Sequence, residues 1–264
     1  MEEISIADDI LTIMPLGAGQ EVGRSCIIVK YRKHTIMLDC GVHPGFLETA
    51  GLPFFDAIDP GEIDLLLITH FHIDHCAAVP WFLTQTNFQG KCYMTPATKA
   101  IFKILLQDYV RVSSGNNNDQ SLFNKIDLDR CIPKILPATF KQVITHNGIK
   151  ITCYRAGHVL GACMWMIDID GVRILYTGDF SLEDDRHLKG AEIPPISPDV
   201  LIIESTHGIT RNEPRADREY RFKDYVTKIV ERGGRCLIPI FALGRVQELL
   251  LILEEYWDSN PKLQ

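Results

Sequence analysis

The sequence of 264 residues predicts a mixed α/β protein of the α+β type. Short apolar runs separated by turn residues fill the first part of the chain and return after residue 140. Stretches with helical spacing lie between these two β-rich parts. From about residue 209, a charged helix, an apolar strand and an apolar helix follow one another, in the order typical of the opening of an α/β domain.

The first β-rich part is predicted to hold strands at residues 11–14, 25–31, 35–40 and 63–68. Between the first two strands, residues 17–23 have the spacing G-x-G-x-x-x-G. A dinucleotide-binding loop is rejected because a strand, and not a helix, follows these glycines. We therefore expect a sharp turn near the functional site.

Two helices are expected at residues 77–86 and 98–109, with a strand at 91–94 between them and a loop at 113–120 after them. The second β-rich part is predicted to hold strands at residues 140–144, 149–156, 163–169, 173–177 and 200–203. Asp170-Gly171 is a hairpin signal. The last segment should form a helix at 215–232, a buried strand at 235–241 and a helix at 243–257. These elements favour one domain at 1–208 and the truncated beginning of another at 209–264.

Composition narrows the class of protein. The apolar content of 46% is that of a globular protein, and no apolar run is long enough to span a bilayer. The formal net charge of −7 argues against a self-sufficient nucleic-acid binder. Bound divalent ions would reverse that charge locally, so a phosphodiester substrate is still compatible with the chain. The eight dispersed cysteines favour buried thiols in a reducing intracellular compartment.

The most informative pattern is H-x-H-x-D-H, formed by His70, His72, Asp74 and His75 directly after an apolar strand. Neutral imidazole and carboxylate are ligands that zinc and similar divalent ions prefer. A surface turn rich in histidine is the alternative. With nine histidines in the whole chain, three within six positions are improbable by chance. Cys76 follows directly, and a packing role is favoured over ligation.

Two further candidates follow predicted strands: His158 between glycines, and Asp179 in a Gly-Asp turn. His70 and His72 would hold one ion with His158, whereas Asp74 and His75 would hold a second. Asp179 has two carboxylate oxygens and suits a bridge between the ions. Two ions about 3.5–4 Å apart can stabilise both the attacking and the leaving oxygen of a hydrolytic displacement. Asp39, at the end of its own strand, is expected to orient a ligand, with a strand-end cap as the alternative.

The second ion would have only three protein ligands, Asp74, His75 and Asp179, and one more imidazole is expected. His43, His187 and His207 are poor candidates for the missing ligand. We expect that ligand to lie beyond Gln264, and therefore expect weak or absent activity from this chain alone.

At these residues the chain resembles the metallo-β-lactamase-fold hydrolases, and within them the nucleic-acid-processing β-CASP branch. The resemblance rests on residues 15–25, 64–80, 156–161, 176–187, 203–206 and 239–245. It implies an αβ/βα sandwich followed by the start of a β-CASP domain. Within that branch the chain is most similar to the nucleases that cleave pre-mRNA before polyadenylation.

The resemblance also implies a function. It indicates an endoribonuclease with two zinc ions held by His70, His72, Asp74, His75, His158 and Asp179. It assigns catalytic roles to Asp74, Asp179 and Glu204, the last by orienting a histidine that acts as general acid. The implied partners are pre-mRNA and other subunits of a cleavage and polyadenylation complex in the nucleus, with no membrane. An Integrator-type RNA endonuclease and a small-molecule metallo-hydrolase are the alternatives.

Arg245 follows a predicted strand and opens a predicted helix, a position that suits contact with a phosphate. A structural ion pair is an equally good interpretation of this residue.

Overall fold

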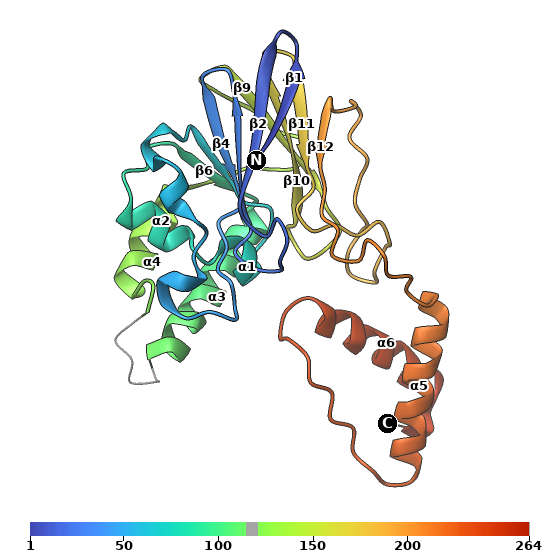
Figure 1. Ribbon diagram of the computed structural model, residues 1–264. Helices are drawn as coiled ribbons and strands as arrows, with labels where there is room; N and C mark the ends of the chain where they lie inside the picture. The colour runs from blue at the N-terminus through green and yellow to red at the C-terminus, as the bar shows by residue number, and fades with distance from the viewer. Residues whose placement is uncertain (115–120, 264) are drawn as a thin grey trace. The chain divides into compact units, whose positions relative to one another are not determined.

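The computed structural model describes residues 1–114 and 121–263 (Figure 1). The chain divides into two compact units. Unit 1 comprises Met1–Leu182 and Gly190–Glu204, and unit 2 comprises Glu183–Lys189 and Ser205–Gln264. The domain boundary expected after residue 208 stays a prediction. Most of the loop expected at 113–120 lies outside the described residues.

Unit 1 contains a seven-stranded sheet whose strands follow one another in sequence order. The first four strands pair antiparallel, whereas β4 to β7 pair parallel. The strands are β1 (Glu2–Ile6), β2 (Asp9–Gly17), β3 (Cys26–Tyr31), β4 (His34–Leu38), β5 (Leu65–Leu67), β6 (Lys91–Met94) and β7 (Ile135–Pro137).

Helices cover one face of this sheet (Figure 1). They are α1 (Ile73–Cys76), α2 (Val79–Gln85), α3 (Pro96–Ser114) and α4 (Lys125–Cys131), with short 3₁₀ turns at η1 (Glu48–Gly51), η2 (Phe55–Ala57), η3 (Pro60–Glu62) and η4 (Ile132–Lys134). The start of α4 is fixed by a capping box between Asn124 and Asp127.

The second sheet of unit 1 has five strands in the order β12-β11-β10-β9-β8. They are β8 (Val143–His146), β9 (Ile149–Arg155), β10 (Cys163–Ile169), β11 (Val172–Tyr176) and β12 (Val200–Ile202). Asp170 and Gly171 both have positive φ, as a two-residue hairpin turn of the predicted kind requires.

Two apolar cores hold these layers together. One lies between the first sheet and its helices, and includes Phe82 and Phe102. The other lies between the two sheets, and includes Trp165 and Tyr31. The described residues of unit 1 thus form a helix layer and two packed sheets. This arrangement agrees with the predicted fold class.

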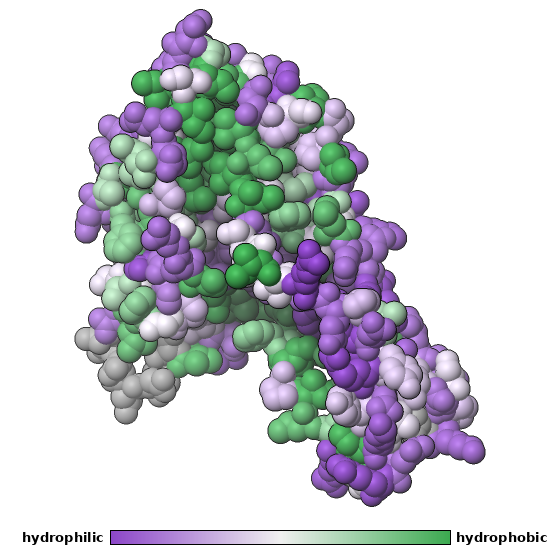
Figure 2. Space-filling model, turned by 45° about the vertical axis from the view of Figure 1, so that its right-hand side comes forward, coloured by the Kyte–Doolittle hydropathy of each residue, from purple (hydrophilic) through white to green (hydrophobic). Residues whose placement is uncertain are grey.

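The sequence placed most strands of unit 1 correctly, but it missed β1, α4 and β7. The strand expected at 200–203 forms as β12, although it is not buried. Leu201 is 51% exposed and Ile203 is 53% exposed, because β12 is an edge strand. Figure 2 shows apolar residues reaching the surface over the strand-rich part of unit 1.

Unit 2 contains α5 (Arg215–Glu231), α6 (Arg245–Ser259) and the turn η5 (Pro261–Leu263). The strand expected at 235–241 is wrong, since this segment is extended but unpaired, with Leu237 92% and Phe241 90% exposed. A strand is stable when it pairs with neighbours, and the described residues of unit 2 offer no other strand. No helix in the described residues is both long and apolar enough to cross a membrane.

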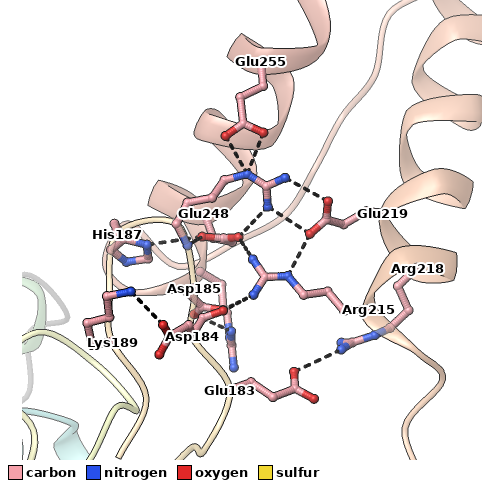
Figure 3. A network of polar contacts seen from close by, with 12 residues as sticks. Glu183, Asp184, Asp185, His187, Lys189, Arg215, Arg218, Glu219, Glu248 and Glu255 are labelled. Carbon is pink, nitrogen blue, oxygen red and sulfur yellow. Dashed lines mark hydrogen bonds and ion pairs between the residues drawn. The ribbon is translucent and has the colours of Figure 1, made fainter.

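An ion-pair network organises unit 2 (Figure 3). The guanidinium of Arg186 contacts Glu219 of α5 and Glu248 and Glu255 of α6 at 2.8–2.9 Å. Arg215 also contacts Glu219 and Glu248. The network therefore holds the segment 183–189 against both helices of unit 2.

We expect Trp165→Ala to lower the free energy of unfolding by about 3–5 kcal/mol, because a fully buried aromatic side chain leaves a cavity. Leu201→Ala, on the exposed edge strand, should cost less than about 1 kcal/mol. Urea denaturation followed by circular dichroism measures both values. Equal losses for the two variants would contradict the assignment of the core.

Candidate metal centre

The predicted site residues of unit 1 all follow strands. Asp39 follows β4, the H-x-H-x-D-H run follows β5, and His158, Asp179 and Glu204 follow β9, β11 and β12. The two sheets are joined at this point, because the Cys163 amide donates to the Thr69 carbonyl at 3.0 Å. The indole of Trp165 donates to the Ile68 carbonyl at 3.1 Å. Strand ends from both sheets therefore meet at one site.

Two glycines allow this close approach. Gly178 has a φ of +52°, and a Cβ there would lie 2.7 Å from Cβ of Thr69. Gly157 has a φ of +71°, and a Cβ there would lie 2.4 Å from the Ser181 carbonyl oxygen. A larger residue at either position would push apart the turns that carry Asp179 and His158.

Four ligand-type side chains converge: His70, His72, His158 and Asp179 offer ligand atoms that all lie within 4.8 Å of one another. Nδ1 of His72 lies 2.9 Å from Nε2 of His70 and 3.2 Å from Nε2 of His158. Oδ2 of Asp179 lies 4.0 Å and 3.7 Å from the same two Nε2 atoms. The structure thus brings together the set predicted for the first ion.

The second predicted set lies on the other side of Asp179. Nε2 of His75 is 3.5 Å from Oδ2 of Asp74 and 3.6 Å from Oδ1 of Asp179. Asp179 therefore faces the first set with Oδ2 and the second set with Oδ1. This orientation is the one expected of a bridging carboxylate.

Asp39 is a fully buried carboxylate that contacts the second set directly and the first set through Thr69. Its Oδ2 lies 2.9 Å from Nδ1 of His75 and accepts the Tyr176 hydroxyl at 2.8 Å. Its Oδ1 accepts the Thr69 amide at 2.7 Å. The Thr69 hydroxyl lies 2.9 Å from Oδ2 of Asp39 and 2.9 Å from Nδ1 of His70.

These contacts assign the tautomers of two histidines. A carboxylate only accepts, so the Thr69 hydroxyl donates to Asp39 and accepts from Nδ1–H of His70. Nδ1–H of His75 donates to Asp39 directly. In the neutral form of each ring, the form that binds a metal, the lone pair is then on Nε2, the atom that faces the centre. Hydrogen bonds of this kind orient metal-bound imidazoles.

The histidines of the cluster differ in pKa because their surroundings differ. Burial, and then the neighbouring histidines, hold the pKa of His70 well below its usual range. Burial also lowers the pKa of His72. These two rings are therefore neutral, the form that binds a metal. Burial would lower the pKa of His75 too, but Asp39, Asp179 and Asp74 together outweigh it and raise the pKa to about 9. Burial raises the pKa of Asp179, with His75 opposing that shift.

The donor set fits a divalent metal ion. Imidazole nitrogens and carboxylate oxygens suit zinc and related ions. Zinc–nitrogen bonds of about 2.0–2.1 Å in a tetrahedral shell place neighbouring ligand atoms about 3.3 Å apart. The four separations given above, from 2.9 to 4.0 Å, lie on either side of that value.

Three further candidates of unit 1 are outside the four-ligand set. Nδ1 of His43 accepts from the Gly45 amide at 3.0 Å, and its ring packs on Phe46. Cys76 is buried and its thiol donates to the Phe71 carbonyl, as its predicted packing role requires. Glu204 lies near enough to Asp179 for its charge to raise the pKa of that carboxyl group.

In unit 2, His187 lies 3.4 Å from Glu248, and His207 belongs to an exposed loop. Arg245 forms an ion pair with Asp185 at 3.0 Å, which supports the structural interpretation of this arginine.

Sequence reasoning missed Thr69 and Tyr176. Thr69 directly precedes His70, and Tyr176 ends β11 three residues before Asp179. A polar residue at the end of a buried strand was the available signal for both. Their role depends on contacts with Asp39 across the fold, which local sequence does not reveal.

Comparisons with known proteins define the class. Residues 28–201 match the metallo-beta-lactamase superfamily domain, and the chain belongs to that superfamily. A crystal structure of a protein of unknown function from Enterococcus faecalis V583 has a TM-score of 0.51 and 16% identity. It covers 95% of this chain and 58% of that chain, and it supports the fold alone.

Within that class, the chain is similar to cleavage and polyadenylation specificity factor subunits and to a protein named endoribonuclease YSH1. It is 59% identical over 258 residues to cleavage and polyadenylation specificity factor subunit 3 of Dictyostelium discoideum, covering 97% of this chain and 33% of the relative. It is 56% identical over 255 residues to cleavage and polyadenylation specificity factor 73 of Drosophila melanogaster, covering 97% and 37%. It is 49% identical over 252 residues to endoribonuclease YSH1 of Saccharomyces cerevisiae, covering 93% and 32%.

The chain therefore spans about a third of the length of these relatives. The comparisons confirm the predicted family resemblance.

We expect the stability of the metal-free protein to fall as the pH rises from 6.5. His75 has a pKa of about 9 in the folded protein and an ordinary value of 6.5 when unfolded. Its stabilising contribution is complete below pH 6.5 and is lost as the pH rises toward 9. Between pH 6.5 and about pH 8, the free energy of unfolding should fall by about 2 kcal/mol.

Asp39→Asn should flatten this pH dependence, because it removes the charge that sustains the raised pKa of His75. Asp8→Asn, which alters an exposed carboxylate, should leave the dependence intact. Urea denaturation at several pH values measures all three proteins. An unchanged slope in Asp39→Asn would contradict the assignment.

Proposed function

We propose that this protein is a zinc-dependent endoribonuclease that hydrolyses RNA phosphodiester bonds in pre-mRNA 3′-end processing. The observation that carries the proposal is the convergence of three imidazoles and Asp179 at the meeting of the two sheets. Support for the substrate comes from the similarity to relatives named as endoribonucleases and as subunits of the cleavage and polyadenylation factor. The proposal concerns the activity of the full-length protein.

The ligands divide into two sets. His70, His72, His158 and Asp179 hold the first zinc ion, and Asp74, His75 and Asp179 hold the second. The opposed directions of the two Asp179 oxygens support this division. The first set has four protein ligands and the second has three, so the first ion is held more tightly.

Bound divalent ions at such a centre supply an activated water and stabilise charge on the phosphate. The protein's own groups prepare the site for them. Asp39 and Thr69 fix the ring orientations of His75 and His70. Asp74 and Asp179 place negative charge within the ligand cluster, where it would favour bound cations. Glu204 is proposed to orient a histidine that protonates the leaving oxygen.

The setting of the reaction is part of the same proposal. We place the protein in the nucleus, with pre-mRNA as substrate and other subunits of a cleavage and polyadenylation complex as partners. The division into a metallo-β-lactamase-like domain at 1–208 and the start of a β-CASP domain at 209–264 is also proposed. Similarity to relatives named as cleavage and polyadenylation specificity factor proteins supports this setting over an Integrator-type role.

Substrate choice separates the proposal from a small-molecule hydrolase of the same fold. We expect the zinc-loaded full-length protein to cleave an RNA oligonucleotide faster than a thioester or a lactone. Parallel turnover assays on the same preparation make the comparison. Hydrolysis of the thioester without any cleavage of RNA would exclude the nuclease.

His72→Ala should abolish RNA cleavage by the full-length protein and remove one zinc ion per chain, because Nδ1 of His72 faces two other ligands of the first set. The fold should persist, since His72 is only partly buried. Zinc content by mass spectrometry, cleavage assays and thermal unfolding test this prediction.

His146→Ala, which alters a histidine on β8, is the matched control and should keep both zinc and activity. Full cleavage by a folded His72→Ala variant would refute the ligand assignment.

A further inference from the structure

A cluster of flat side chains lies on the surface of unit 1 around Arg24. The guanidinium Cζ lies 4.5 Å from the ring centre of Phe54 and 5.5 Å from that of Phe46. Phe54 is 60% exposed and Phe46 is 48% exposed, although each ring already has Arg24 beside it. The arrangement therefore leaves aromatic surface open to solvent. We call Arg24, Phe46 and Phe54 the Arg24 platform.

The platform is held in place by the fold. Glu21 binds the Arg24 guanidinium through both oxygens, at 2.5 and 3.1 Å. A third contact runs from Nη1 of Arg24 to the Ala50 carbonyl at 3.2 Å. The backbone amide of Phe54 donates to the Leu16 carbonyl at 2.9 Å. Because these groups are already ordered, a ligand that stacks on them loses little binding energy to ordering.

The platform adjoins the proposed metal centre. Ser25, the residue after Arg24, donates its amide to the carbonyl of Asp74 at 2.8 Å. Val42, four residues before Phe46, donates its amide to the carbonyl of Ile73 at 3.1 Å. The backbone segments that carry Arg24 and Phe46 are therefore bonded to the short helix α1, which carries Asp74 and His75.

The charge of the platform favours stacking over phosphate binding. Arg24 is neutralised by its bidentate pair with Glu21, and the whole chain has a formal net charge of −7. A protein without a strong positive field needs contacts with nucleic acid that do not depend on phosphate charge. Aromatic side chains and guanidinium planes supply them by stacking on unpaired bases.

We propose that the Arg24 platform binds an unpaired base of the RNA substrate by stacking, next to the metal centre. The inference rests on the proposed RNA substrate and adds a binding site to it. It assigns to Phe54 and Phe46 the positioning of single-stranded RNA, whereas the metal ligands act on the phosphate.

The test uses the zinc-loaded full-length protein and a set of single-stranded RNA oligonucleotides, each carrying 2-aminopurine at one position. Stacking quenches the fluorescence of this base, and one position should be quenched on binding to the wild type. Phe54→Ala should abolish that quenching and weaken binding by about 5- to 150-fold. Phe54→Trp should retain both properties, because indole also stacks.

Two controls separate stacking from general apolar contact. Leu47→Ala removes an aliphatic side chain that is 80% exposed in the same loop, and it should leave RNA binding unchanged. An abasic site at the quenched position should weaken binding to the wild type by the same factor as Phe54→Ala. The same abasic RNA should bind the Phe54→Ala variant no more weakly than the intact RNA does.

The outcomes distinguish the two proposals. If the wild type cleaves RNA and Phe54→Ala binds and cleaves it equally well, stacking at the Arg24 platform is refuted. The proposed endoribonuclease activity is not affected by that result. Equal weakening by Leu47→Ala would identify a general apolar surface for a protein partner and would also overturn the platform. If the wild type neither binds nor cleaves RNA, the proposed substrate fails, and the platform fails with it.

Discussion

The buried carboxylate of Asp39 is the interaction on which the candidate site depends. It follows β4 with a φ of +59° and is fully buried between the two sheets. It contacts His75 directly and His70 through the hydroxyl of Thr69. A buried carboxylate without partners would be strongly unfavourable. Its four donor groups therefore both stabilise it and orient one histidine from each ligand set.

This arrangement explains why neighbouring histidines differ in protonation. Burial, and then the surrounding imidazoles, hold the pKa of His70 well below its usual range, so the ring is neutral. His75 faces three carboxylates, so its pKa is raised to about 9. A cation between Asp74, His75 and Asp179 would replace the proton of His75 as the neutralising charge. The same acidic surroundings that hold this proton thus favour a metal ion in its place.

Features that depend on short stretches of sequence could be predicted before the structure was known. Six candidate ligands were recognisable because each follows an apolar strand and has a side chain that metals prefer. The hairpin at Asp170-Gly171 and the helix α5 followed from turn chemistry and periodicity. Residues 235–241 have the composition of a buried strand, yet they are unpaired, because a strand requires a neighbour that local sequence does not specify. Thr69 and Tyr176 escaped prediction for a similar reason, since only the packing of the two sheets brings them to Asp39.

In the proposed centre, Asp179 joins the four-ligand set of the first zinc ion to the three-ligand set of the second. Anomalous diffraction at the zinc edge, from crystals of the zinc-loaded protein, tests it most directly. We predict one zinc ion bound by His70, His72, His158 and Oδ2 of Asp179, and a second between Asp74, His75 and Oδ1 of Asp179, with the lower occupancy at the second. Zinc bound away from these residues, or with Asp179 outside both shells, would contradict the account.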